Sequence, residues 1–215
     1  GAGCNKSCDA SLLEGYPIHQ DMYESCKLLD PYFLVNTVFT PDGEISEVVA
    51  GHWYEAWQKG CKDLLAMAGV HIKQLADVVI ASAGGYPKDL NLYQATKCHM
   101  NAQFAVKHGG IMIFTLDCPD IKEPAIFTDC FSRNDMEQFE KDIRANFTIP
   151  AFVAFKARCI VNDVTAYLVT RPENFDFVRK TGHIPCASLQ EAWDMAQEKL
   201  AEQGKKDYNI TIMGH

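Results

Sequence analysis

Three side chains in the segment ADVVIASAGGYPKDLNLYQATK, residues 76–97, could act together on one small ligand. Tyr93, Gln94 and Lys97 stand at positions i, i+1 and i+4 of a helical pattern. Tyr93 and Lys97 are therefore one turn apart, and Gln94 flanks both of them. The three residues offer an aromatic surface, an amide that donates or accepts hydrogen bonds, and a cation. This combination suits a small carboxylate or hydroxyacid.

The segment before this helix has the composition of a ligand-binding loop. Gly84 and Gly85 follow an apolar run at 77–83, and without Cβ atoms they allow a sharp turn or the close approach of a ligand. Pro87 stiffens the loop, and Asp89 is able to cap the helix. Open α/β sheets bind ligands beyond the carboxyl ends of their strands. We therefore expect Gly84, Gly85 and Pro87 to bind substrate or cofactor; the alternative is a tight turn followed by a helix with a solvated lysine.

The elements around this loop alternate between strands and helices. Apolar runs predict strands at 77–83, 111–117, 164–170 and 208–213. Helical patterns cover 89–107, 134–147, a segment that starts at Pro150, and 189–204, which opens with a Ser188–Glu191 capping box. We expect helix 89–107 to end at His108-Gly109-Gly110, and His99 to be solvated or at the edge of the core. The alternation predicts an α/β domain with a doubly wound, mostly parallel, Rossmann-like sheet.

The front of the chain has a different pattern. Helices at 19–29 and 52–69 enclose two short strands joined by the turn Thr40-Pro41-Asp42-Gly43. One hairpin is too few strands for a separate core, so this helix–hairpin–helix segment is expected to be the remnant of another domain. The predicted divisions are 1–66 for this front portion, 67–76 for a linker, 77–207 for the α/β domain and 208–215 for a return strand. The sequence also begins without Met, as expected of part of a longer protein.

Composition argues against several classes of partner. The net charge of −8 and pI of about 5.3 oppose nucleic-acid binding, which needs a basic face. No apolar stretch approaches the roughly 18 residues of a membrane span, and no secretion signal is recognisable. The nine cysteines are odd in number and scattered, so we expect buried free thiols in a reducing cytoplasm. Cys4 and Cys8 have the spacing of half a zinc site, but without a second pair no metal site is predicted.

Two motifs resemble those of a known family. The segment GGYPKDLNLYQATK resembles the Gly-Gly-x-Pro-x-Asp-x-x-x-Tyr-Gln-x-x-Lys signature of the nickel-dependent lactate racemase family. The segment LLEGYPIHQDM is similar to that family's Leu-x-Gly-Asn-Pro-Val-His-Glu-Asp-Met segment, with Tyr16 in place of the asparagine. The resemblance runs from about residue 11 to the end of the chain. It identifies the chain as the C-terminal part of such a protein, with 1–66 as the rear portion of the N-terminal catalytic domain.

The resemblance implies a function for the whole protein. Members of the family interconvert D- and L-2-hydroxyacids by hydride transfer to a nickel-pincer nucleotide held between two α/β domains. The second domain contributes the equivalents of Gln94 and Lys97 to the substrate pocket, with Tyr93 in the same motif. By this analogy Lys97 holds the anionic substrate and Gln94 hydrogen-bonds it. The implied partners are a small 2-hydroxyacid and the missing N-terminal domain, and a second copy of the truncated chain is a further candidate.

The family's cofactor-bearing lysine, nickel-binding histidine and two acid/base histidines all precede the matched region. None of these roles can be given to His19, His52, His71, His99 or His108. His19 matches the motif histidine beside the first helix, and a structural role is expected for it. We therefore expect the fragment alone to hold no nickel-pincer nucleotide and to be inert.

Two other functions are compatible with the same residues. A Tyr-x-x-x-Lys pair is also the catalytic pair of short-chain dehydrogenases, in which case Tyr93 and Lys97 would serve an oxidoreductase. That family needs a glycine-rich dinucleotide turn well upstream, and no Gly-x-x-x-Gly-x-Gly occurs here. The second alternative is a non-catalytic module that binds a small acid or a partner protein through the 84–97 segment.

Overall fold

The computed structural model describes residues 15–214, which belong to two compact units. The first unit ends at His71 and the second begins at Ile72, so the division lies inside the 67–76 segment. Across the described residues, every helix is too short or too polar to cross a lipid bilayer.

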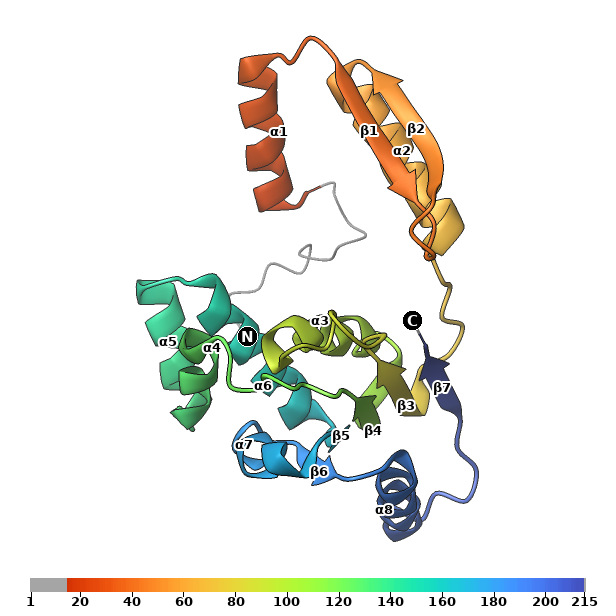
Figure 1. Cartoon of the computed structure of the whole chain (residues 1–215), viewed down its shortest axis with the longest axis vertical. Helices are drawn as coiled ribbons and strands as arrows, with labels where there is room; N and C mark the ends of the chain where they lie inside the picture. Colours follow the sequence, from red (N-terminus) through yellow and green to blue (C-terminus); the bar gives the residue numbers. More distant parts are fainter. Residues whose placement is uncertain (1–14, 215) are drawn as a thin grey trace. The chain divides into compact units, whose positions relative to one another are not determined.

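The first unit contains a hairpin covered by one helix (Figure 1). Its elements are α1 (Pro17–Leu29), β1 (Leu34–Phe39), β2 (Ile45–Gly51) and α2 (Trp53–Ala68). β1 and β2 pair in antiparallel register around the predicted turn, where Gly43 has a φ of +84° and its N–H donates to Thr40 O. The buried apolar residues described in this unit are Val38, Val49 and Ala56. So small a set of buried residues is less than an independent domain normally needs.

The second unit is built on a five-stranded parallel sheet. Its strands are β3 (Ala76–Ser82), β4 (Val106–Thr115), β5 (Thr165–Val169), β6 (Ile184–Cys186) and β7 (Ile210–Met213). They follow the order β6-β5-β4-β3-β7, so β3 lies inside the sheet between two parallel neighbours. This arrangement confirms the predicted α/β fold.

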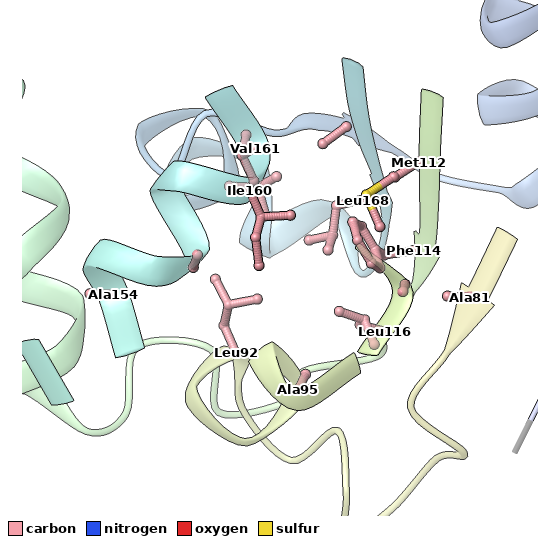
Figure 2. Packing of buried hydrophobic residues seen from close by; sticks show 14 of the residues in the cluster. Ala81, Leu92, Ala95, Met112, Phe114, Leu116, Ala154, Ile160, Val161 and Leu168 are labelled. Carbon is pink, nitrogen blue, oxygen red and sulfur yellow. The ribbon is translucent and has the colours of Figure 1, made fainter. Parts of the chain in front are cut away.

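Helices cover both faces of the sheet. They are α3 (Leu92–Ala102), α4 (Ala125–Thr128), α5 (Met136–Ala145), α6 (Ile149–Asp163), α7 (Phe175–Lys180) and α8 (Leu189–Glu202), with short 3-10 turns η1 (Asp129–Ser132) and η2 (Pro172–Asn174). On one face Phe114 and Leu168 of the strands pack with Leu92 of α3 and Ile160 of α6 (Figure 2). On the other face strand residues pack against α8, in the cluster Val78, Ile111, Ile113, Tyr167, Ala192, Ala196 and Leu200. Alternate residues of the strands thus pack in two separate clusters, as in a sheet buried on both sides.

The region of the predicted helix 89–107 differs from the expectation. α3 is shorter, and its N-cap is Asn91, whose Oδ1 accepts from Gln94 N at 2.9 Å, rather than Asp89. His108, Gly109 and Gly110 are not a helix end but part of β4. The pairing of β3 with β4 is irregular there, and a Cβ on Gly110 would lie 2.8 Å from Lys107 O and 3.0 Å from Asp77 O. Gly110 is therefore required for the close approach of the two strands.

Candidate functional site

A pocket of about 660 Å³ lies at the carboxyl ends of β3 and β7 in the second unit. Residues 81–83 of β3 and its following loop, and Met213 and Gly214 of β7 and its end, form one side. Pro87, Lys88 and Leu90 of the loop and Gln94, Lys97, Cys98 and Asn101 of α3 form the rest. In the sheet, β4 follows β3 in the sequence and lies on one side of it, whereas β7 pairs with β3 on the other side. The pocket therefore lies where the strand order reverses, the usual ligand position of open α/β sheets.

Gln94 and Lys97 are joined by a hydrogen bond at this pocket. Lys97 Nζ donates to Gln94 Oε1 at 2.8 Å. This bond uses one of the two lone pairs of the Gln94 amide oxygen and leaves the NH₂ group as a donor, beside the remaining ammonium protons of Lys97. The pair therefore presents more donors than acceptors, together with a positive charge, which favours a ligand with carboxylate or other acceptor oxygens.

Ser82, Lys88 and Asn101 also line the pocket and were missed by the sequence analysis. Ser82 Oγ accepts from Gly84 N at 3.1 Å, so its hydroxyl proton remains available for a ligand. Two of these three residues could have been found from their positions in the sequence. Asn101 lies seven residues after Gln94 on the same helical face, and Lys88 lies within the glycine–proline loop.

The other predicted site residues have different positions. Gly84 and Gly85 have φ values of +86° and +76°, so the loop turns through two left-handed positions that favour glycine. They shape the loop but do not line the pocket, whereas Pro87 does. Tyr93 is half-buried and its ring packs edge-to-face on Phe127, with centroids 5.4 Å apart. The structure thus brings Pro87, Gln94 and Lys97 together and places Tyr93 against the core.

The loop that carries Pro87 and Lys88 is fixed to the segment that follows β4. Asp89 is buried, and its Oδ2 accepts from Asp117 N at 3.1 Å while its carbonyl accepts from Cys118 N at 3.0 Å. Asp117 in turn forms a bidentate pair with Arg171, with N···O distances of 2.7 and 2.6 Å. Hydrogen bonds from the guanidinium hold the pKa of Asp117 below its usual value. The pocket loop therefore has a defined backbone before any ligand binds.

The expectation for His99 was wrong, because this residue is fully buried. Its ring stacks on Phe114 with a centroid distance of 3.7 Å, and its Nε2 lies 2.8 Å from Nε2 of His183, which is also buried. Burial lowers the pKa of His99 to about 4 and that of His183 well below its usual value. Both rings are therefore neutral at physiological pH. His99 lies on the core side of α3, away from the α3 residues that line the pocket, and His183 reaches it from the segment just before β6.

The chemistry of the remaining candidates is limited. In the part of the chain that the structure describes, no group of three or more His, Cys, Asp or Glu side chains could hold a metal ion. Cys4 and Cys8 lie outside the described residues. Burial raises the pKa of the pocket residue Cys98 to about 11, so its thiol is not ionised near neutral pH. In the first unit, His19 stacks on Trp57 with centroids 4.9 Å apart.

The fold and the pocket define a doubly wound α/β domain with a pocket lined by Lys88 and Lys97 at the reversal of its strand order. The chain belongs to the lactate racemase family: residues 71–214 match the model of the lactate racemase C-terminal domain. This match confirms the resemblance drawn from the two motifs.

Individual relatives support the same assignment. The lactate racemase of Thermoanaerobacterium thermosaccharolyticum is 30% identical over 207 residues, which cover 94% of this chain and 48% of that protein. The lactate racemase of Lactiplantibacillus plantarum is 32% identical over 103 residues, 48% of this chain and 24% of that protein. The solved lactate racemase apoprotein from T. thermosaccharolyticum aligns with a TM-score of 0.85 at 27% identity, over 97% of this chain and 50% of that chain. The chain thus spans about half the length of the T. thermosaccharolyticum racemase.

Proposed function

We propose that this chain is the substrate-binding C-terminal region of an enzyme that interconverts D- and L-2-hydroxyacids. The observation that supports this most is the hydrogen-bonded pair of Gln94 and Lys97 at the pocket, within the domain that matches the racemase family. Because the chain spans only about half of a related racemase, the activity is proposed for a protein that also has the other half. The chain by itself is expected to be inert.

In this proposal the residues of the pocket bind and orient the substrate. The ammonium of Lys97 holds the substrate carboxylate, and the NH₂ group of Gln94 donates to the carboxylate or the 2-hydroxyl. Ser82 supplies a third donor from the end of β3. Tyr93 supports α3 through Phe127 instead of contacting the substrate.

The family implies a nickel-pincer nucleotide in the full enzyme, where it would accept and return the hydride. Within residues 15–214, where no three His, Cys, Asp or Glu side chains gather as metal ligands, no residue is proposed to hold this cofactor. Its binding is assigned to the N-terminal domain of the same protein, which is the proposed partner of the first unit. A second copy of the chain is the alternative partner. Cytoplasmic localisation is also proposed, because Cys26, Cys61, Cys98, Cys118, Cys130 and Cys186 are free thiols.

Binding of lactate to the chain tests the role of the pocket. In a ¹H–¹⁵N NMR titration, lactate should shift the amide signals of Ser82, Gln94 and Lys97, and Lys97→Ala should weaken binding by about tenfold, the effect of losing one charge-assisted hydrogen bond. Lys206→Ala, which removes an exposed lysine outside the pocket, is the matched control. An unchanged affinity in Lys97→Ala would refute the proposed role. In the intact parent protein the same variant should lose racemase activity to a similar degree while melting normally, because Lys97 is exposed.

The dehydrogenase alternative is not favoured. Its mechanism needs a lysine close to the tyrosine hydroxyl, but Lys97 donates to Gln94 and the Tyr93 ring packs on Phe127. Family membership also places the chain with the racemases.

A further inference from the structure

The pocket carries two positive side chains, and none of the described residues that line it is acidic. Lys88 and Lys97 are both exposed to it. Lys97 donates to the neutral amide of Gln94, and within residues 15–214 neither lysine forms an ion pair with a carboxylate. Two cations without counter-charges in one pocket, in a chain of net charge −8, favour a ligand with two negative groups.

The two lysines approach the pocket from different elements. Lys97 projects from α3, whereas Lys88 belongs to the loop after β3. The neighbouring Asp89 fixes that loop through its bonds with Asp117 N and Cys118 N, so the backbone of Lys88 is positioned and only its side chain must adjust. A ligand held by Lys97 could therefore meet a second cation without a rearrangement of the loop.

The lining between the charged groups is apolar. Ala81, Ala83 and Leu90 contribute carbon surface to the same pocket. A volume of about 660 Å³ lies within the range of roughly 300–1,000 Å³ that larger organic ligands occupy. Lactate, whose side chain is one methyl group, would use the Lys97 end and leave Lys88 without a partner.

We propose that the pocket is specific for 2-hydroxyacids that carry a second carboxylate on the side chain. Lys97 and Gln94 hold the carboxylate next to the hydroxyl group, and Lys88 holds the distal carboxylate. Apolar residues contact the carbon chain between them. This inference rests on the proposed function, because it assumes that Gln94 and Lys97 bind a 2-hydroxyacid.

The test compares two acids that differ only at the distal group. Malate carries a second carboxylate where 2-hydroxybutyrate carries a methyl group. In NMR or calorimetric titrations of the full chain, malate should bind about tenfold more tightly than 2-hydroxybutyrate, as one additional charge-assisted hydrogen bond would give. Lys88→Gln should reduce malate affinity to the level of 2-hydroxybutyrate and leave 2-hydroxybutyrate unchanged.

Two further variants separate a local contact from a general change in charge. Lys88→Arg retains the cation and should retain the preference for malate. Lys206→Gln removes the same charge outside the pocket and should leave both affinities unchanged. Since Lys88 and Lys206 are exposed, all three variants should melt like the parent.

The possible outcomes distinguish this inference from the proposed function. Equal affinities for the two acids, or equal effects of Lys88→Gln and Lys206→Gln on malate, would overturn the dicarboxylate specificity while leaving 2-hydroxyacid binding intact. If neither acid shifts the signals of Gln94 and Lys97, both the inference and the proposed substrate pocket are wrong.

Discussion

Acidification should destabilise the α/β unit through His99 and His183. Both rings are buried, and their facing Nε2 atoms are 2.8 Å apart. In the folded unit one of these nitrogens donates a hydrogen bond and the other accepts it. If both rings were protonated, two N–H groups would point at each other, so the doubly protonated pair is disfavoured. His183 is further disfavoured as a cation by its burial and by the nearby Arg158. The folded unit therefore takes up protons less readily than the unfolded chain.

The size of the effect follows from the pKa of His99, which falls from an ordinary value near 6.5 to about 4. The unfolded chain binds more protons than the folded unit between these values, so stability is complete above about pH 6.5 and falls as the pH decreases toward 4. The loss is at most about 1.4 kcal/mol per pH unit for His99, or about 3 kcal/mol over the range. His183 adds to this loss in the same direction. A domain with a total stability of 5–15 kcal/mol would show such a change clearly.

Urea unfolding at several pH values, followed by NMR signals of β4 and β5, measures this slope in the α/β unit alone. Ring ¹⁵N titrations report the protonation of each histidine directly. His99→Gln should flatten the slope, whereas His71→Gln, which removes an exposed histidine, should leave it unchanged. A stability that stays constant between pH 6.5 and 4.5, or a His99 ring that titrates near 6.5, would refute the reasoning.

Three further predictions concern stability. Burial raises the pKa of Asp77, but hydrogen bonds from Lys107, Lys205 and Asn209 outweigh this effect and hold that pKa well below its usual value. Asp77→Asn should therefore cost about 2 kcal/mol in urea unfolding at pH 7 and reduce the loss of stability below about pH 4. Asn91→Ala removes the N-cap of α3 and should cost about 1 kcal/mol, while Asn91→Ser should restore most of it; equal losses in both would contradict the capping role. Gly110→Ala should lower the melting temperature of the unit by several degrees, because the added Cβ would clash with the Lys107 and Asp77 carbonyls.

The strands of the α/β unit were predictable because their burial is visible as continuous apolar runs. The run at 77–83 and the run at 164–170 both became inner strands. β6 was missed because it has only three residues and includes Pro185, which weakens any strand pattern. The His108-Gly109-Gly110 segment was misread because glycine after a helical pattern usually ends a helix, whereas here it permits a close strand contact.

The candidate site was predictable only where its residues share one short motif. Pro87, Gln94 and Lys97 follow from helical spacing and from the glycine loop. Met213 and Gly214 could not be found, since only the sheet order brings β7 beside β3. The partner of His99 was hidden for the same reason, because His183 is 84 residues away in the sequence. Position within a helix is local information, but the neighbours of that helix depend on the tertiary fold.

The position of β7 has a consequence for the order in which the α/β unit folds during its synthesis. Asp77 and Asn209, which join the start of β3 to the segment before β7, are 132 residues apart. During translation β3 therefore emerges long before the strand that completes its second edge, and this edge stays open to wrong pairing until the ribosome has nearly finished the unit. One wall of the pocket arrives with the same strand. The pocket is complete only when β7 has paired with β3, so the proposed ligand binding would report that this last strand is in place.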